Sequence, residues 1–114
     1  ESLTSALDLA VDGEIFVLKN DGTVVKFSKN KQVEFELDAV EYQISPSKII
    51  TPNESAPLYI LDKAAGRVIV YDKKTGKLTA QYVAEQSIID AAVNDSNSQM
   101  AVLYEKEVKI YNLK

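Results

Sequence analysis

The feature that most constrains this chain is a pair of short apolar segments that occurs three times. Leu18, Leu61 and Leu103 end the first segment of each pair, at intervals of 43 and 42 residues. The segments are four to seven residues long, rich in Val, Ile, Leu, Phe and Tyr, and bounded by turn residues, which indicates β-strands. No run of a dozen residues shows the apolar spacing of an amphipathic helix. The sequence therefore predicts an all-β fold built from a repeated unit.

Eleven strands are expected, in groups of four, four and three. They span residues 6–11, 14–18, 23–27, 33–37, 48–51, 58–61, 67–71, 78–83, 88–93, 99–103 and 108–111. A four-stranded antiparallel unit that recurs every 40 to 44 residues is typical of a β-propeller blade. The single segment 1–114 is therefore predicted to hold two complete four-stranded blades, at about 5–38 and 47–84, and three strands of a third, at about 87–113.

Two stretches carry a family resemblance. Residues 6–18, ALDLAVDGEIFVL, resemble the opening of NHL-type blades, and residues 66–77, GRVIVYDKKTGK, are similar to a hairpin of NHL, YVTN and quinoprotein-like blades. More loosely, the order of segments resembles the C-terminal propeller segments of uncharacterised bacterial proteins that carry a membrane-tethered, metal-dependent phosphatase-like domain elsewhere. The resemblance implies blade architecture rather than one activity, and it favours a bacterial cell-envelope or exported setting.

An incomplete third blade raises the question of closure. Closed propellers use roughly four to eight blades, so the expected strands form only a partial ring, with apolar faces and strand edges left in water. Either the chain is a segment of a longer propeller, as the missing initiating Met suggests, or identical copies complete the ring, two of them giving about six blades. The absent fourth strand also predicts an unfilled edge beside residues 108–111, able to accept a strand from a partner.

Composition removes several classes of function. The chain has no His, Cys or Trp, which excludes imidazole and thiolate catalysis and the usual zinc, haem and iron–sulfur ligand sets. Its 13 basic and 17 acidic residues, a net charge of −4, argue against nucleic-acid binding. Its apolar runs are too short for direct membrane insertion. No cofactor is expected, and the composition by itself leaves the compartment open.

Candidate interaction residues lie in the loops. The turns between second and third strands should share one surface with the connections between units, where a protein or small ligand could bind. The residues predicted on this surface are Tyr42, Gln43, Pro46, Asp62, Lys63, Glu85, Gln86, Glu105 and Lys106. The opposite surface should carry solvated turn lysines that keep the hairpins soluble. These are Lys29, Lys31, Lys73, Lys74 and Lys77.

Several acidic residues are candidates for metal ligands or catalytic groups. Asp8 and Asp90 occupy near-equivalent first strands and are expected to face a central channel, where they could bind a cation or hydrogen-bond neighbouring turns. The Asp12-Gly13 and Asn20-Asp21-Gly22 sequences predict hairpin turns rather than ligands. We expect no catalytic residue and a non-catalytic binding or scaffold module, or chiefly an assembly element. The alternative is a metal-assisted, lactonase-like hydrolase that uses the channel-facing carboxylates.

Overall fold

The protein consists of β-strands connected by turns and loops. The computed structural model describes residues 3–40, 45–84, 86–94, 96 and 98–113, and these contain eleven strands in three antiparallel sheets and no α-helix. This confirms the predicted all-β class and the grouping of four, four and three strands. Nothing in the described part of the chain is a helix of the length and hydrophobicity needed to cross a membrane.

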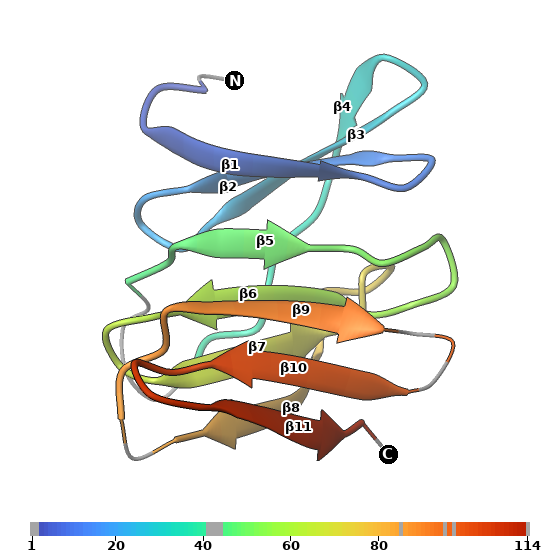
Figure 1. The fold of residues 1–114 in the computed structure, drawn as a ribbon. Helices are drawn as coiled ribbons and strands as arrows, with labels where there is room; N and C mark the ends of the chain where they lie inside the picture. The colour runs from blue at the N-terminus through green and yellow to red at the C-terminus, as the bar shows by residue number, and fades with distance from the viewer. Residues whose placement is uncertain (1–2, 41–44, 85, 95, 97, 114) are drawn as a thin grey trace.

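Each sheet is formed by strands that follow one another along the chain (Figure 1). Sheet A contains β1 (Ala6–Val11), β2 (Ile15–Lys19), β3 (Val24–Ser28) and β4 (Lys31–Val33). Sheet B contains β5 (Lys48–Ile50), β6 (Leu58–Asp62), β7 (Arg67–Tyr71) and β8 (Leu78–Val83). Sheet C contains β9 (Asp90–Asn94), β10 (Gln99–Leu103) and β11 (Val108–Asn112).

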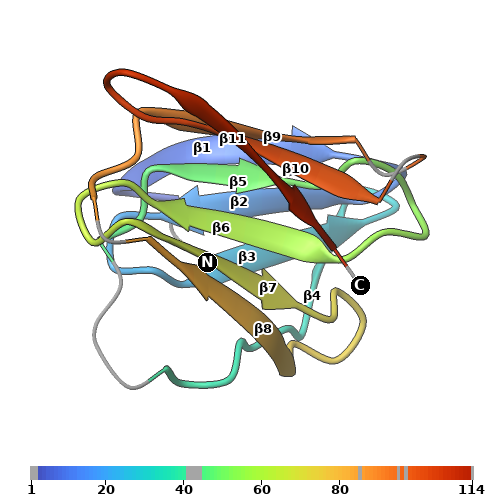
Figure 2. The ribbon, with the colours of Figure 1, turned by 60° about the horizontal axis from the view of Figure 1, so that its bottom comes forward.

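Sheet B lies between the other two sheets (Figure 2). The side chains on both of its faces are buried. Side chains along a strand point alternately to the two faces. Leu58 and Ile60 therefore pack against sheet A, whereas Tyr59 and Leu61 pack against sheet C. Every residue of β6 and β7 is buried. The hydrophobic core is thus divided into two layers, one on each side of sheet B.

The turns at the ends of the hairpins follow the local sequence. Gly13 and Gly22 have φ angles of 118° and 91°, which L-residues rarely adopt. The Asp12 and Asp21 side chains accept hydrogen bonds from the amides of Glu14 and Thr23, two residues further on. Both sequences therefore form hairpin turns, as predicted.

The fourth strand of sheet A differs from the prediction. The prediction of a strand at residues 33–37 is wrong, because β4 covers Lys31–Val33 only. Lys29 and Asn30 both have positive φ angles, so the chain reverses within two residues and Lys31 already pairs with Ser28. Phe35 and Leu37, whose alternation suggested a strand, instead pack against the core between sheets A and B.

Candidate interaction surfaces

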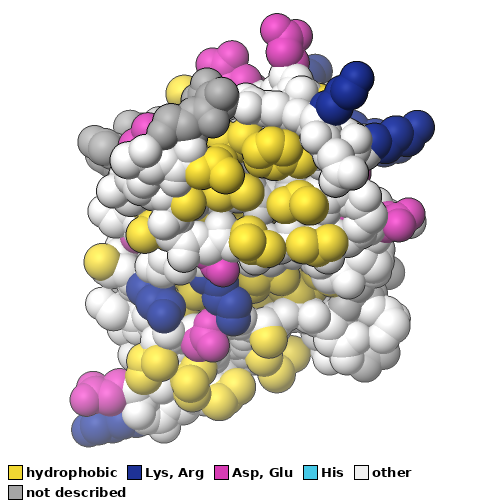
Figure 3. Space-filling view, turned by 90° about the horizontal axis from the view of Figure 1, so that it is seen from above, with side chains coloured by type: hydrophobic (Ala, Val, Ile, Leu, Met, Phe, Trp, Pro, Cys, Tyr) yellow, Lys and Arg dark blue, Asp and Glu magenta, His cyan; other side chains and the backbone are white. Residues whose placement is uncertain are grey.

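The outer face of sheet A is apolar, and its β1 side is open to solvent. By strand alternation and register, β1 and β2 present Leu9, Val11 and Ile15 on the side away from sheet B. Leu9 and Val11 are 58 % and 61 % exposed. Figure 3 looks onto this side of the molecule and shows hydrophobic side chains gathered on it. Contiguous exposed apolar side chains of this kind mark interaction sites in soluble proteins.

The outer face of sheet C is also apolar. Leu103 of β10 is opposite Val108 of β11, and Ala101 is opposite Ile110, all on the side away from sheet B. Val108 and Ile110 are more than half exposed. The stack of three sheets therefore has an exposed apolar face at each end.

The predicted loop surface is organised around Asp62, which is itself buried and only 1 % exposed. Its carboxylate accepts hydrogen bonds from the Ser45 and Ala65 amides and pairs with Arg67 Nε at 3.2 Å. The Lys63 amide donates to the Ser47 hydroxyl at 3.4 Å. Asp62 therefore holds the β6–β7 turn against the preceding connection rather than offering its carboxylate to a partner.

The other described residues of this surface lie close to the same turn. The Ile88 amide donates to the Lys63 carbonyl oxygen, and Gln86 Nε2 donates to Glu107 Oε2 at 3.1 Å. Glu105 and Lys106 are exposed in the β10–β11 turn. These contacts bring the turns and connections to one surface. The other predicted residues are Pro46, which is partly buried, and Tyr42, Gln43 and Glu85, which lie outside the described residues.

Asp8 and Asp90 belong to a row of charged residues on the first strand of each sheet. Asp8, Lys48 and Asp90 are opposite Leu18, Leu61 and Leu103, the equivalent leucines of the second strands, so the three positions are equivalent. Asp8 Oδ2 accepts a hydrogen bond from the Ile49 amide, and Asp90 Oδ1 pairs with Lys48 Nζ, both at 3.0 Å. The hydrogen bond from Lys48 lowers the pKa of Asp90. Both aspartates therefore have partners in sheet B.

The described residues contain no group of three or more His, Cys, Asp or Glu side chains placed to hold a metal ion. The two aspartates considered as cation ligands lie on different sheets, and a lysine from the sheet between them pairs with one of them. An ammonium group beside a carboxylate competes with a bound cation for the same oxygen atoms. This arrangement gives the carboxylates a role in joining the sheets.

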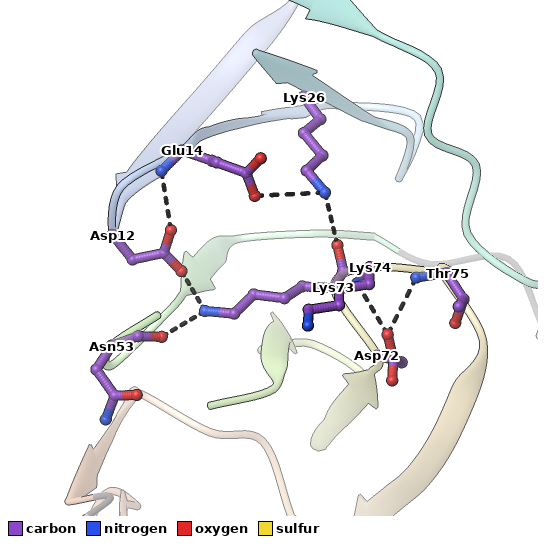
Figure 4. Close-up of polar contacts among 8 residues, drawn as sticks. All are labelled: Asp12, Glu14, Lys26, Asn53, Asp72, Lys73, Lys74 and Thr75. Carbon is purple, nitrogen blue, oxygen red and sulfur yellow. Dashed lines mark hydrogen bonds and ion pairs between the residues drawn. The ribbon is translucent and has the colours of Figure 1, made fainter. Parts of the chain in front are cut away.

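Two buried lysines join sheet A to the β7–β8 turn (Figure 4). Lys73 Nζ contacts Asp12 Oδ2 and the Asn53 carbonyl oxygen. Lys26 Nζ donates to the Lys73 carbonyl oxygen at 3.0 Å and lies 3.4 Å from Glu14 Oε1. The prediction that Lys73 is a solvated turn lysine is therefore wrong. Its sequence context did not reveal this, because its partners are brought to it only by the stacking of the sheets.

A small hollow lies where sheets B and C meet beside the edge strand β11. It has a volume of about 230 Å³ and is lined in part by Tyr82, Tyr104 and Tyr111. The hydroxyl groups of Tyr104 and Tyr111 are 2.8 Å apart. Burial, followed by this hydrogen bond, raises the pKa of Tyr104 to about 12. In the described part of the chain β11 is an edge strand of sheet C, so an unpaired edge lies where it was predicted.

A comparison with the models of known protein families finds none that matches the chain, and a comparison with curated proteins finds no significant match.

Proposed function

We propose that this chain is a non-catalytic interaction module of the β-propeller class, whose end faces dock onto further antiparallel sheets. The observation that carries the proposal is the contrast between sheet B, buried on both faces, and sheets A and C, each with an exposed apolar outer face. Burying a large apolar side chain contributes about 1.5 to 3 kcal/mol. The exposed faces therefore provide the driving force for docking.

The arrangement of the sheets supports the propeller class. Each sheet is a meander whose strands lie in chain order, and the sheets pack face to face in the same order. The first strand of sheet A lies beside the first strand of sheet B. These are features of neighbouring propeller blades, in agreement with the resemblance to NHL, YVTN and quinoprotein-like blades.

The hydrolase alternative would require the carboxylates to exchange their partners. Asp8 would have to release the Ile49 amide, and Asp90 would have to release Lys48 Nζ. Thermal unfolding in Ca²⁺, Mg²⁺ or Zn²⁺ tests this alternative, because an ion that binds only the native state raises the unfolding temperature. A rise that Asp8→Asn and Asp90→Asn abolish would favour the hydrolase.

The interaction module is tested with an apolar fluorescent dye, anilinonaphthalene sulfonate, at protein concentrations low enough to keep the chain monomeric. We expect the dye to bind both end faces. Leu9→Lys on sheet A and Ile110→Lys on sheet C should each remove about half of the bound dye. Val83→Lys is the matched control, because Val83 is exposed on the outer strand of sheet B and belongs to neither end face. Absence of dye binding by the folded monomer contradicts the proposal.

A further inference from the structure

The two outer faces correspond to the two sides of the contacts already made between sheets. The strand register is the same in all three sheets, so each residue of β2 or β3 has an equivalent in sheets B and C. The pairs at one such position are Leu18 with Val24, Leu61 with Val68, and Leu103 with Val108. We name the side of a sheet that carries this pair its forward face, and the opposite side its reverse face.

Both internal contacts join a forward face to a reverse face. The forward face of sheet A, with Phe16 and Leu18, is buried on the reverse face of sheet B, with Leu58 and Ile60. The forward face of sheet B is buried in the same way on the reverse face of sheet C, which includes Met100. The pairing rule is therefore the same at both contacts.

The chain leaves one face of each kind exposed. The outer face of sheet C is a forward face, in which Leu103 and Ile110 are equivalent to Leu61 and Val70 of sheet B. The outer face of sheet A is a reverse face, in which Ile15 is equivalent to Leu58 of sheet B. By the internal rule, the outer face of sheet C is complementary to the outer face of sheet A.

The polar contacts between first strands follow the same repeat. In each contact, a charged side chain of one sheet bonds to the backbone of the next sheet. The backbone group belongs to the residue that follows the equivalent of the charged residue in that next sheet. The two contacts are Ile49 N to Asp8 Oδ2 at 3.0 Å, and Lys48 Nζ to the Ala91 carbonyl oxygen at 3.4 Å. Asp90 is the third member of this row, and Leu9 is equivalent to Ile49. Asp90 could therefore accept a hydrogen bond from the Leu9 amide of another molecule.

We infer that the partner of these faces is a second copy of this chain, docked head to tail so that each outer face of sheet A covers the outer face of sheet C of the other copy. This inference rests on the proposed function and names its partner. Strand spacing and rise give each face a footprint of roughly 300 Å². Two reciprocal contacts cover four such faces and therefore bury on the order of 1,200 Å², above the 1,000 Å² that a specific interface should exceed, whereas one contact buries about half of that.

The test is the mass of the 114-residue protein in solution, measured by sedimentation over a range of concentrations. We expect a dimer, with twice the monomer mass of 12.6 kDa. Leu9→Lys and Ile110→Lys should each raise the dissociation constant at least about 100-fold, because each places an unpaired charge in both contacts. Val83→Lys should remain dimeric. Circular dichroism and thermal unfolding of each variant show whether the monomer is still folded.

The two lysine variants also determine which faces meet. Loss of the dimer in both variants supports head-to-tail docking. Loss only in Leu9→Lys would mean that two A faces meet, and loss only in Ile110→Lys would mean that two C faces meet; either result overturns the inference. A wild-type monomer that binds the dye on both faces also overturns it, but leaves the proposed function in place. A folded monomer that binds no dye overturns both.

Discussion

Lys73, in the turn between β7 and β8, is buried against Asp12, in the turn between β1 and β2. The two side chains are 8 % and 4 % exposed, and 61 residues separate them in the sequence. Lys73 Nζ also contacts the Asn53 carbonyl oxygen. A buried charge requires a charged or hydrogen-bonding partner. This ion pair therefore fixes the position of sheet A relative to sheet B at one edge of the apolar contact between them.

Replacing Lys73 with Met should destabilise the protein by about 3 kcal/mol, because Asp12 is left as an uncompensated buried charge. The measurement is the free energy of unfolding from a urea titration. Lys74→Met is the matched control, since Lys74 is the next residue and its side chain is exposed; its effect should be within about 0.5 kcal/mol.

A second variant separates charge from packing. The double substitution Lys73→Met with Asp12→Asn removes both charges, and it should recover part of the stability lost in Lys73→Met. Equal destabilisation by Lys73→Met and Lys74→Met would show that the pair contributes nothing to the contact between sheets A and B.

Local patterns predict the strands but not their partners across sheets. The strands 6–11, 67–71, 78–83 and 99–103 were predicted with the bounds that the structure has, because alternation and turn residues act within a few positions. Lys73 and Lys74 look alike in the sequence, yet only one is buried, because the difference depends on a residue in another sheet. The second strands are similarly apolar in all three sheets, so sequence alone does not indicate which faces stay exposed.

The segment that follows β4 packs closely against Gly76 in the β7–β8 turn. This glycine has a φ angle of 80°, and a Cβ added to it would overlap the Glu36 carbonyl oxygen. The Asp38 amide donates to the Gly76 carbonyl oxygen, so residues 36–38 run directly over the β7–β8 turn. Gly76→Ala should therefore destabilise the protein by about 2 kcal/mol or more, through backbone strain and displacement of this segment.

Hydrogen exchange measures the local part of this effect. The Asp38 amide should lose protection in Gly76→Ala, whereas amides in sheet C should change only with the global stability. Lys77→Ala is the control, because its side chain is exposed and the substitution leaves the turn backbone unchanged. Full protection of the Asp38 amide from hydrogen exchange in Gly76→Ala would contradict the close approach of residues 36–38 to Gly76.

The raised pKa of the buried Tyr104 hydroxyl should make the protein less stable in strong base. This pKa is raised from the ordinary tyrosine value of 10.0 to about 12, first by burial and then by the hydrogen bond with Tyr111. Between these pH values the unfolded chain has released a proton that the folded protein still holds. The free energy of unfolding should therefore fall as the pH rises from 10 towards 12.

Tyr104→Phe isolates this effect from the titration of the lysines. At pH 7 the variant should be less stable than the wild type by about 1 kcal/mol, because the Tyr111 hydroxyl loses its partner. The difference should shrink as the pH rises from 10 towards 12, since the variant has no Tyr104 proton to release. Unfolding temperatures of both proteins across this range are the measurement, and a constant difference would contradict the raised pKa.

The pair formed by Lys48 and Asp90 should contribute to stability at neutral pH and not in acid. The hydrogen bond from Lys48 lowers the pKa of Asp90 below the ordinary aspartate value of 3.8. A carboxyl group with a lowered pKa in the folded state stabilises the protein above its unfolded pKa, and this contribution is lost as the pH falls through the folded pKa. The two side chains are 37 % and 49 % exposed, so solvent screening limits the contribution to under about 1 kcal/mol.

A double-mutant cycle with Lys48→Met and Asp90→Asn measures this coupling directly. We expect a coupling energy of about 0.5 kcal/mol at pH 7, decreasing towards zero once the pH is well below the pKa of Asp90. Added salt should weaken the coupling at pH 7, because both groups are partly exposed to solvent. A coupling energy that persists unchanged in acid would mean that the two residues are linked through packing rather than through charge. It would contradict the prediction that protonation of Asp90 removes the coupling.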